Sequence, residues 1–347
     1  MVTPFNRFDL VRLVLASWVF VYHAFVLSSA QPGGAIEGGL AVMAELSIQG
    51  FFIVSGALVY GSYERSKNLA DYAGKRVRRL YPAYAVVILV PALIAGVYAL
   101  QSERSILDVL KYVGANLVFL NFLEPNLPGF FEGQRFTEVN GALWTLKIEV
   151  MFYLLLPLIA WALARLGKHW WLGIGALILM AFAWVELMMA SETALAPALA
   201  RQLPGQMMFF AAGIVLWKIW PLARAQAVWF GLIGGVALAL SLLIPGFEAL
   251  RVLGLAGLIV GLAFGPGPAL NVASYGDVSY GIYIVHFPIA QMLVSFGAFN
   301  ALGIVGGLIL SAILVVLTSY ALWWWVEKPA LRRDSHYKIT STRKALS

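Results

Sequence analysis

The stretch RFDLVRLVLASWVFVYHAFVL, residues 7–27, is long and apolar enough to cross a bilayer as an α-helix. It carries Arg12 near one end and His23 eleven residues further along. Because an α-helix has 3.6 residues per turn, this spacing places the two side chains on one face, roughly 16 Å apart along the axis. Ionisable side chains inside a membrane helix commonly line a cavity or pathway. The pair therefore predicts a functional face that joins two depths of the membrane.

Each of the two residues also has a purely structural interpretation. Arg12 stands where a positive charge can anchor a first helix on the cytoplasmic side. His23 belongs to the polar residue types that hydrogen-bond between membrane helices. Their position on one shared face favours the functional interpretation over two unrelated structural ones.

The composition of the chain is that of a polytopic membrane protein. Of 347 residues, 61% are hydrophobic and only 12% are charged, which excludes soluble multi-domain classes. The absence of cysteine excludes disulfides, thiolate zinc sites and a cysteine nucleophile. The first apolar run lacks a small-residue cleavage site followed by a polar domain, so we expect a retained helix and not a signal peptide.

Ten apolar runs are long enough to span a bilayer. They lie near residues 8–28, 42–62, 80–100, 142–163, 170–190, 204–220, 227–245, 250–266, 278–297 and 302–326. If the N-terminus is cytoplasmic, the basic clusters fall on the cytoplasmic side, as the positive-inside rule demands. These clusters comprise Arg7, Arg65, Lys67, Lys75, Arg76, Arg78, Arg79, Arg165, Lys168, Lys218, Arg224 and the tail from Lys328 to Lys344. The sequence thus predicts an all-α, polytopic protein with about ten transmembrane helices and both termini cytoplasmic.

Residues 105–123 form a further apolar run that carries Asp108 and Lys111. If this run crossed the membrane, every later loop would change sides and the basic tail would be exported. We therefore expect an interfacial or re-entrant segment on the outer side. The loop that follows, residues 124–141, is polar and aromatic; it is either the lip of an acceptor site or a simple linker.

The second apolar run and the loop after it contain two candidate features. Ser55 and Gly56 are small residues that permit close packing of helices, and packing is the favoured interpretation. Lys75-Arg76-Val77-Arg78-Arg79 precedes the third run. Guanidinium groups match phosphate oxygens bidentately, so this cluster suits a phosphate-bearing ligand. A topology signal explains the same cluster equally well.

The run from Trp144 to Tyr153 contains Glu149 within an apolar context. A carboxylate inside the membrane needs a cation, a hydrogen bond or a proton. Lys147 is only two residues away and lies on another face of the helix. Arg12 or His23 is a possible partner, in which case Glu149 would orient the imidazole or tune its basicity.

The run from Ser279 to Pro288 places Tyr283 and His286 on one helix face, with Tyr280 a further step back. A polar seam between helices is the favoured interpretation, because tyrosine and histidine often join membrane helices. The sequence Trp323-Trp324-Trp325 is an aromatic belt at the membrane surface. Nucleophile-elbow, P-loop and zinc-ligand motifs are all missing from the sequence, so we expect no metal and no ATP-driven activity.

Together these residues resemble the membrane-bound acyltransferase 3 family over nearly the whole chain. The resemblance is carried by motifs that recur in a fixed order. They are Asp9 with Arg12-x10-His23, Phe52-x-x-Ser55-Gly56, Arg76-x-Arg78, Trp144-x-Leu146-x-x-Glu149-x-x-Phe152-Tyr153, Ser279-Tyr280-x-x-Tyr283-x-x-His286-x-Pro288 and Glu327-Lys328-Pro329. Family members often carry a second acidic residue after the motif glutamate, where this chain has Val150. The hydrolase-like domain fused to some relatives is not found.

The resemblance implies a ten-helix acyltransferase domain, here over residues 1–333 with a basic cytoplasmic tail over 334–347, in a bacterial inner membrane. It implies an O-acyltransferase that moves an acyl group, acetyl most commonly, from cytoplasmic acyl-CoA to a glycan hydroxyl. The donor is a substrate, and no bound cofactor is expected. His23 and Glu149 are the predicted catalytic residues, and Arg12, Arg76 and Arg78 the predicted acyl-CoA-binding residues. The predicted supporting residues are Asp9, Ser55, Trp144, Tyr153, Tyr283 and His286.

The expected acceptor is an exopolysaccharide, O-antigen or lipid-linked sugar, and the expected partners are this acceptor, acyl-CoA and membrane lipids, without nucleic acid. A multi-pass transporter or flippase is the competing class, since ten helices with intramembrane Arg, Glu and His also suit proton-coupled transport. An inactive family member that acts as a biosynthetic partner is a third possibility. The sequence does not identify the acyl group, the acceptor hydroxyl, the oligomeric state, or whether transfer is direct or passes through an acyl-enzyme.

Overall fold

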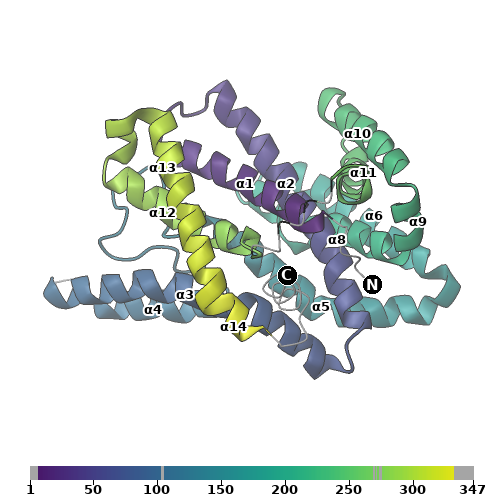
Figure 1. The fold of residues 1–347 in the computed structure, drawn as a ribbon, viewed down its shortest axis with the longest axis horizontal. Coiled ribbons are helices and arrows are strands. Elements are labelled where there is room, and N and C mark those ends of the chain that lie inside the picture. Colours follow the sequence, from purple (N-terminus) through teal and green to yellow (C-terminus); the bar gives the residue numbers. More distant parts are fainter. Residues whose placement is uncertain (1–6, 103–104, 269, 271, 273–275, 332–347) are drawn as a thin grey trace. The chain divides into compact units, whose positions relative to one another are not determined.

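The computed structural model describes residues 7–102, 105–268, 270, 272 and 276–331, and these residues are helical without any β-strand (Figure 1). The basic tail predicted for 334–347 lies outside the described residues. The elements are α1 (Phe8–Leu27), α2 (Ala35–Glu64), α3 (Leu69–Gln101), α4 (Ile106–Leu117), η1 (Gly141–Leu143), α5 (Trp144–Leu166), η2 (Gly167–His169), α6 (Trp170–Met189), α7 (Ala196–Ala200), α8 (Leu203–Lys218), α9 (Trp220–Ala225), α10 (Ala227–Leu243), α11 (Leu250–Phe264), α12 (Ser279–Ser295), α13 (Ala298–Leu322), η4 (Trp323–Glu327) and α14 (Lys328–Ala330).

Helices form at each of the ten apolar runs predicted from the sequence. Within the described residues, five helical stretches are long and apolar enough to cross a membrane. These are Phe8–Leu27, Ala35–Glu64, Leu69–Gln101, Gly141–Met189 and Ala298–Ala330. The all-helical membrane class is therefore confirmed. The number of about ten crossings and the cytoplasmic position of both termini stay predictions.

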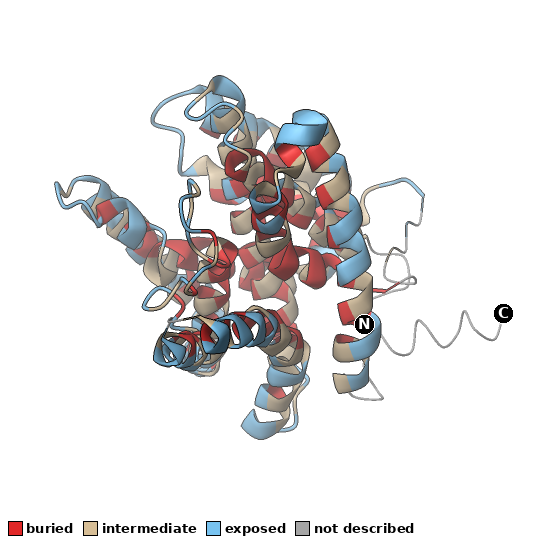
Figure 2. Cartoon of the chain, turned by 90° about the vertical axis from the view of Figure 1, so that its left-hand side faces the viewer, coloured by how far each residue is buried: buried red, intermediate tan, exposed pale blue. Residues whose placement is uncertain are grey.

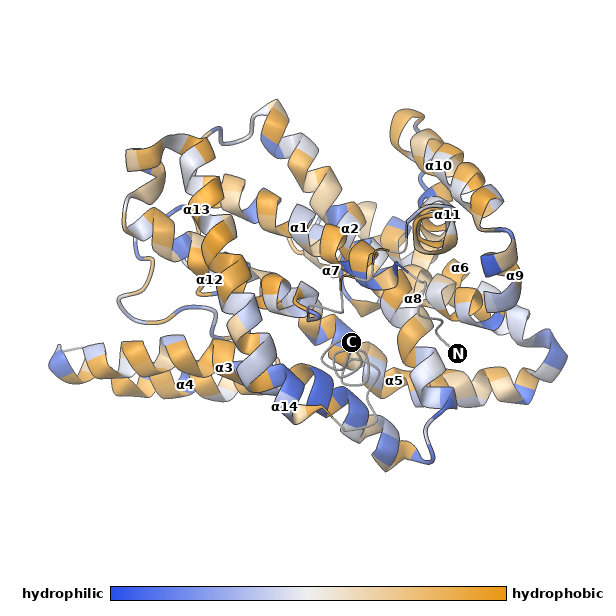
Figure 3. Cartoon of the chain, in the orientation of Figure 1, coloured by the Kyte–Doolittle hydropathy of each residue, from blue (hydrophilic) through white to orange (hydrophobic). Residues whose placement is uncertain are grey.

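The outer face of α3 illustrates why these helices belong in a membrane. Leu93 and Leu100 are 68% and 79% exposed, and Val90 and Ile94 nearby are also exposed. Figure 3 shows apolar residues along most of the helices, with hydrophilic residues gathered at the start of α3. Most helices carry exposed as well as buried residues along their length (Figure 2). Apolar surface on this scale is stable in contact with lipid and not in water.

The segment predicted to be interfacial or re-entrant contains α4, a helix of 12 residues. Its length of about 18 Å is too short to cross a hydrocarbon core of about 30 Å. The hydroxyl of Tyr84 on α3 donates to the carbonyl of Asn116 at the end of α4, 2.6 Å away. Ile106 at the start of α4 approaches Gly96 of the same α3. α4 thus packs antiparallel to α3; its place at the membrane interface stays a prediction.

The chain divides into two compact units. Unit 1 comprises Met1–Arg12, Leu46–Tyr72 and Ile148–Asn271. Its core includes a close approach of α2 and α8, where a Cβ on Gly56 would lie only 2.1 Å from the carbonyl oxygen of Phe210. Beside this contact, Phe152 of α5 stacks on Phe210 with ring centroids 4.2 Å apart. Glycines also bring α10 and α11 together, since a Cβ on Gly257 would meet the Phe230 carbonyl oxygen at 2.4 Å.

Unit 2 comprises Leu13–Glu45, Ala73–Lys147 and Val272–Ser347 and is built around the buried helix α12. α13 packs along α12, and Gly281 faces Ser319 at their contact. α13 is kinked at Gly303, whose φ of 69° is in the left-handed region. The chain then forms a π-helical turn, η4, that carries Glu327. Such turns are frequent at functional sites.

Candidate active site

α1 carries both residues that first suggested a functional face. In unit 1, Arg12 forms an ion pair with Asp9 one turn earlier, with Nη1 and Oδ1 3.7 Å apart. Both side chains are largely buried, at 13% and 19% exposed. Asp9, which was predicted as a supporting residue, is thus in direct contact with Arg12. His23 lies on the same uninterrupted helix, in the part that belongs to unit 2.

His23 is hydrogen-bonded to His286 of α12, within unit 2. Nδ1 of His23 lies 2.8 Å from Nε2 of His286. The two rings are inclined by 23° with centroids 5.0 Å apart, so a nitrogen of each ring points toward the other ring. Nδ1 of His286 in turn lies 3.0 Å from the carbonyl oxygen of Ile282. Two of the residues predicted from the sequence, His23 and His286, are thus brought together.

Aromatic side chains enclose the histidine pair. Phe287 meets His23 edge to face at 5.2 Å, and Phe20 meets His286 at 6.4 Å. Tyr283 lies edge to face against His286 at 6.0 Å. The hydroxyl of Tyr283 is hydrogen-bonded to the hydroxyl of Thr145, so its ring and not its polar end faces the histidine. The ring of Tyr22 lies 5.1 Å from that of His23, so the pair is surrounded mostly by aromatic rings. The backbone carbonyls of Val19 and Ile282, one turn before each histidine, are polar neighbours of His23 and His286.

Glu149 lies in unit 1, on α5, with two hydrogen-bond donors to one oxygen. The hydroxyl of Ser55 on α2 is 3.3 Å from Oε1, and the hydroxyl of Tyr153, one helical turn further along α5, donates to the same oxygen. The backbone carbonyl of Tyr153 accepts from the hydroxyl of Tyr72, 3.0 Å away. Three predicted site residues, Ser55, Glu149 and Tyr153, thus form one polar cluster. Ser55 has a polar contact beyond packing, whereas Gly56 beside it serves the close approach of helices.

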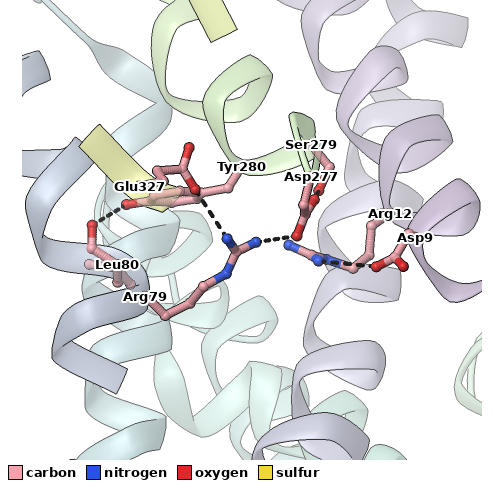
Figure 4. Close-up of polar contacts among 8 residues, drawn as sticks. All are labelled: Asp9, Arg12, Arg79, Leu80, Asp277, Ser279, Tyr280 and Glu327. Atoms are coloured by element: carbon pink, nitrogen blue, oxygen red, sulfur yellow. Dashed lines mark hydrogen bonds and ion pairs between the residues drawn. The ribbon is translucent and has the colours of Figure 1, made fainter. Parts of the chain in front are cut away.

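The arginines at the start of α3 differ in their environment. Arg78 is exposed and Arg76 is half-buried, and phosphate binding by the two stays a prediction. Arg79 instead points into unit 2, where it forms ion pairs with Asp277 and Glu327 (Figure 4). The contact between Arg79 Nη1 and Glu327 Oε2 measures 3.1 Å. The two carboxylate side chains are 1% and 2% exposed.

Sequence reasoning missed this buried charge cluster of Arg79, Asp277 and Glu327. Tyr280 completes it, because its ring lies 5.9 Å from the guanidinium of Arg79 and its hydroxyl donates to the carbonyl of Leu80. One signal was present in the sequence: Glu327 directly follows a tryptophan-rich apolar run and needs a cation. Nothing in the sequence distinguished Arg79 from its basic neighbours.

The loop over residues 118–140 is fastened to the other parts of unit 2. The guanidinium of Arg135 forms hydrogen bonds of 2.8 Å to both carboxylate oxygens of Glu37, which raise the pKa of Arg135, and one of 3.2 Å to the carbonyl of Val26 at the end of α1. Gln291 of α12 donates to the carbonyls of Phe136 and Glu138, at 2.7 and 3.2 Å. The loop is thus held against the two helices that carry the histidine pair.

The end of this loop sets the start of α5. The side chain of Asn140 accepts from the backbone N–H of Ala142 and donates to the carbonyl of Ile284, 2.8 Å away. Gly141 packs against Phe287, where a Cβ would lie 2.9 Å from the ring. Trp144, predicted as a supporting residue, is the half-buried first residue of α5. Within the described residues, no group of three or more His, Cys, Asp or Glu side chains could hold a metal ion.

Comparison with known proteins decides the family. The family model described as an acyltransferase domain, acyltransferase 3, matches residues 5–327. The chain belongs to the acyltransferase 3 family. All of the site residues predicted from the sequence lie within the matched stretch. Membership of this family makes the protein an acyl-transferring enzyme. Its long apolar helices make it a membrane protein.

Three relatives of this acyltransferase match over nearly their whole length. Nodulation protein 10 of Rhizobium leguminosarum bv. viciae is 28% identical, with 94% of this chain and 93% of the relative covered. An O-acetyl transferase of Shigella phage Sf6 is 26% identical, with 95% and 97% covered. A Komagataeibacter xylinus protein provisionally named membrane-bound transacylase BcsY is 25% identical, with 98% and 87% covered. No solved structure matches the chain.

Proposed function

We propose that this acyltransferase moves an acyl group, acetyl in the first instance, from cytoplasmic acyl-CoA to a hydroxyl of a glycan on the other side of a bacterial inner membrane. The acceptor is an exopolysaccharide, an O-antigen or a lipid-linked sugar. The observation that carries the proposal is the imidazole of His23, hydrogen-bonded through one nitrogen, on the helix that begins with the Asp9–Arg12 pair. A relative that carries the name O-acetyl transferase supports acetyl as the group.

In the proposed reaction, the imidazole of His23 is the general base. It takes the proton from the acceptor hydroxyl as the oxygen attacks the thioester carbonyl. The C–S bond then breaks, and the CoA thiolate leaves and takes up the proton from His23. The alternative sequence, in which His23 first accepts the acyl group itself, uses the same residue. A positioned general base contributes a factor of about 10²–10⁴ to the rate.

The other site residues have roles that their charges suit. Arg12 would bind the phosphates or the pantetheine arm of CoA, as would Arg76 and Arg78 at the start of α3, because guanidinium groups match phosphate oxygens. Glu149 would balance the positive charge that develops during proton transfer. The proposed orientation, with ten crossings and both termini cytoplasmic, places the start of α3 on the side that contains acyl-CoA.

The proposal is tested by the acyl content of the surface glycan in a strain that lacks the gene. We expect mass spectrometry to find the glycan without its O-acyl group, and complementation with the wild-type gene, but not with His23→Ala, to restore the group. An unchanged acyl content in the deletion strain would refute the proposal. Loss of the entire glycan from the surface would instead favour the transporter or flippase class.

A further inference from the structure

The two hydrogen bonds of His286 have a fixed direction. Its Nδ1 faces the carbonyl oxygen of Ile282 at 3.0 Å. A carbonyl oxygen can only accept, so Nδ1 of His286 must carry the proton of this bond. In a neutral imidazole, the other nitrogen is then a bare acceptor. Nε2 of His286 is therefore available to accept and unable to donate.

The direction of the hydrogen bond between His286 and His23 follows from this assignment. Its Nδ1 lies 2.8 Å from the accepting Nε2 of His286, so Nδ1 of His23 must be the donor. A neutral His23 then has its second nitrogen, Nε2, without a proton. The two hydrogen bonds cannot run in the opposite direction while both rings are neutral, because the Ile282 carbonyl has no proton to donate to His286. His286 is fully buried, so water does not compete for either of its nitrogens.

We infer that His286 is a positioning residue that holds His23 in the tautomer with a protonated Nδ1 and a basic Nε2. This role rests on the proposed function, in which His23 is the base, although the order of hydrogen bonds stands on the contacts alone. When Nε2 takes the proton of the acceptor hydroxyl, Nδ1 of His23 keeps its bond to His286. His286 then stabilises the imidazolium as a neutral acceptor, a role that a carboxylate fills in hydrolytic triads.

If His286 served only as a polar contact between α1 and α12, its substitutions would have a different pattern of effects from the one expected for a positioning residue. A side chain that fills the volume of His286 would still pack against the rings of Phe20 and Tyr283. His286→Leu and His286→Gln differ in the polar amide, which only glutamine has. Leucine removes the acceptor, whereas the glutamine amide oxygen can accept from Nδ1 of His23. The two variants are therefore a matched pair.

The test combines a spectroscopic measurement with kinetics on the full chain in lipid nanodiscs. The chain has four histidines, so ¹⁵N-histidine NMR on wild type and on single histidine variants can assign the His23 signals. At about pH 8, where unperturbed histidine is neutral, we expect a protonated Nδ1 and a bare Nε2 on His23. We expect His286→Leu to shift His23 toward the other tautomer. A protonated Nε2 in wild type, or an unchanged tautomer in His286→Leu, would overturn the inference.

The kinetic arm measures the release of CoA from acetyl-CoA with a glycan acceptor. We expect His286→Leu to lower kcat about 10²-fold with KM for acetyl-CoA nearly unchanged, and His286→Gln to recover kcat to within about tenfold of wild type. Equal loss in both variants would contradict an acceptor role. If wild type itself releases no CoA, the proposed function fails, and the NMR measurement still decides the role of His286.

Discussion

The hydroxyl of Ser55 on α2 lies 3.3 Å from Oε1 of Glu149 on α5 and donates a hydrogen bond to it. Tyr153 donates to the same oxygen from one turn further along α5. Two hydroxyl groups thus fix the direction of this carboxylate within the core of unit 1. The aromatic stack of Phe152 on Phe210 packs beside them. A carboxylate held in this way suits a role that depends on its position and charge.

Replacing Glu149 by glutamine separates charge from hydrogen bonding. The amide oxygen of Glu149→Gln can still accept from Ser55 and Tyr153, so we expect the fold to persist while the acyl-transfer rate falls about 10²-fold. The measurement is kcat for acceptor-dependent CoA release. The matched control is Glu186→Gln on α6, at an exposed position, which should leave kcat unchanged. Near-normal activity in Glu149→Gln would remove Glu149 from the chemistry.

Arg79 should matter for stability and Arg78 should not. Arg79→Gln leaves the buried carboxylates of Asp277 and Glu327 without this cation, and such a loss costs about 3–5 kcal/mol of unfolding free energy. Arg78→Gln changes an exposed side chain, for which about 0.5 kcal/mol or less is expected. Thermal unfolding of both variants in the same detergent provides the comparison. Equal stability of the two variants would show that the buried charge cluster is not structural.

The close approach of α2 and α8 depends on the missing side chain of Gly56. In Gly56→Ala, the new Cβ would lie 2.1 Å from a backbone oxygen, which cannot rotate away, so the helices must separate. We expect a loss of at least about 1–3 kcal/mol in unfolding free energy. Gly74→Ala on α3 is the control, because its Cβ would meet nothing within 4 Å. That substitution should be neutral or stabilise by up to about 1 kcal/mol. A destabilised Gly74→Ala with an unaffected Gly56→Ala would contradict this packing.

The hydrogen bonds between Gln291 and the loop over residues 118–140 should affect KM for the glycan acceptor and not KM for the acyl-CoA donor. Gln291→Leu removes the amide that holds the carbonyls of Phe136 and Glu138. If the loop forms the lip of the acceptor site, KM for the glycan should rise several-fold while KM for acetyl-CoA stays constant. Gln226→Leu, at an exposed position before α10, is the control. A rise in KM for acetyl-CoA alone would assign the loop to the donor side instead.

The rings of Phe130, Phe131 and Phe136 in this loop suit either stacking on sugars or packing on the membrane surface. Phe131 is buried, so in this conformation it is a packing residue. Phe130 and Phe136 are half-buried, and the ring of Phe136 lies 5.3 Å from the guanidinium of Arg135. A carbohydrate contact of Phe130 or Phe136 stays a prediction.

The helices and their order follow from the apolar runs, because a run of about 20 apolar residues has few alternatives to a membrane helix. The spacing within one helix is equally readable: Tyr153 is four residues after Glu149 and therefore on the same face. Contacts between different helices cannot be read from the sequence in this way. Nothing in the residues around His23 or His286 indicates that α1 meets α12, since many pairings of apolar helices bury similar surfaces.

The basic cluster from Lys75 to Arg79 shows a second feature of the fold that the sequence alone does not predict. Five consecutive positions from Lys75 to Arg79 contain four basic residues that look alike in the sequence. Which of them faces the interior depends on the helical phase relative to Asp277 and Glu327, both of which come from the last quarter of the chain. A sequence alone therefore identifies the cluster as basic, and only the fold separates Arg79, paired with buried carboxylates, from the exposed Arg78.

The most direct test of the central claim is acceptor-dependent release of CoA from acetyl-CoA by the purified protein in lipid nanodiscs, for wild type and His23→Ala. We expect release by wild type to increase when a crude glycan acceptor is added. We expect His23→Ala to lose this increase by a factor of about 10²–10⁴. Near-normal, acceptor-stimulated release by His23→Ala would contradict the assignment of His23 as the base. The absence of release by wild type with every acyl-CoA tested would contradict the acyl-CoA-dependent reaction itself.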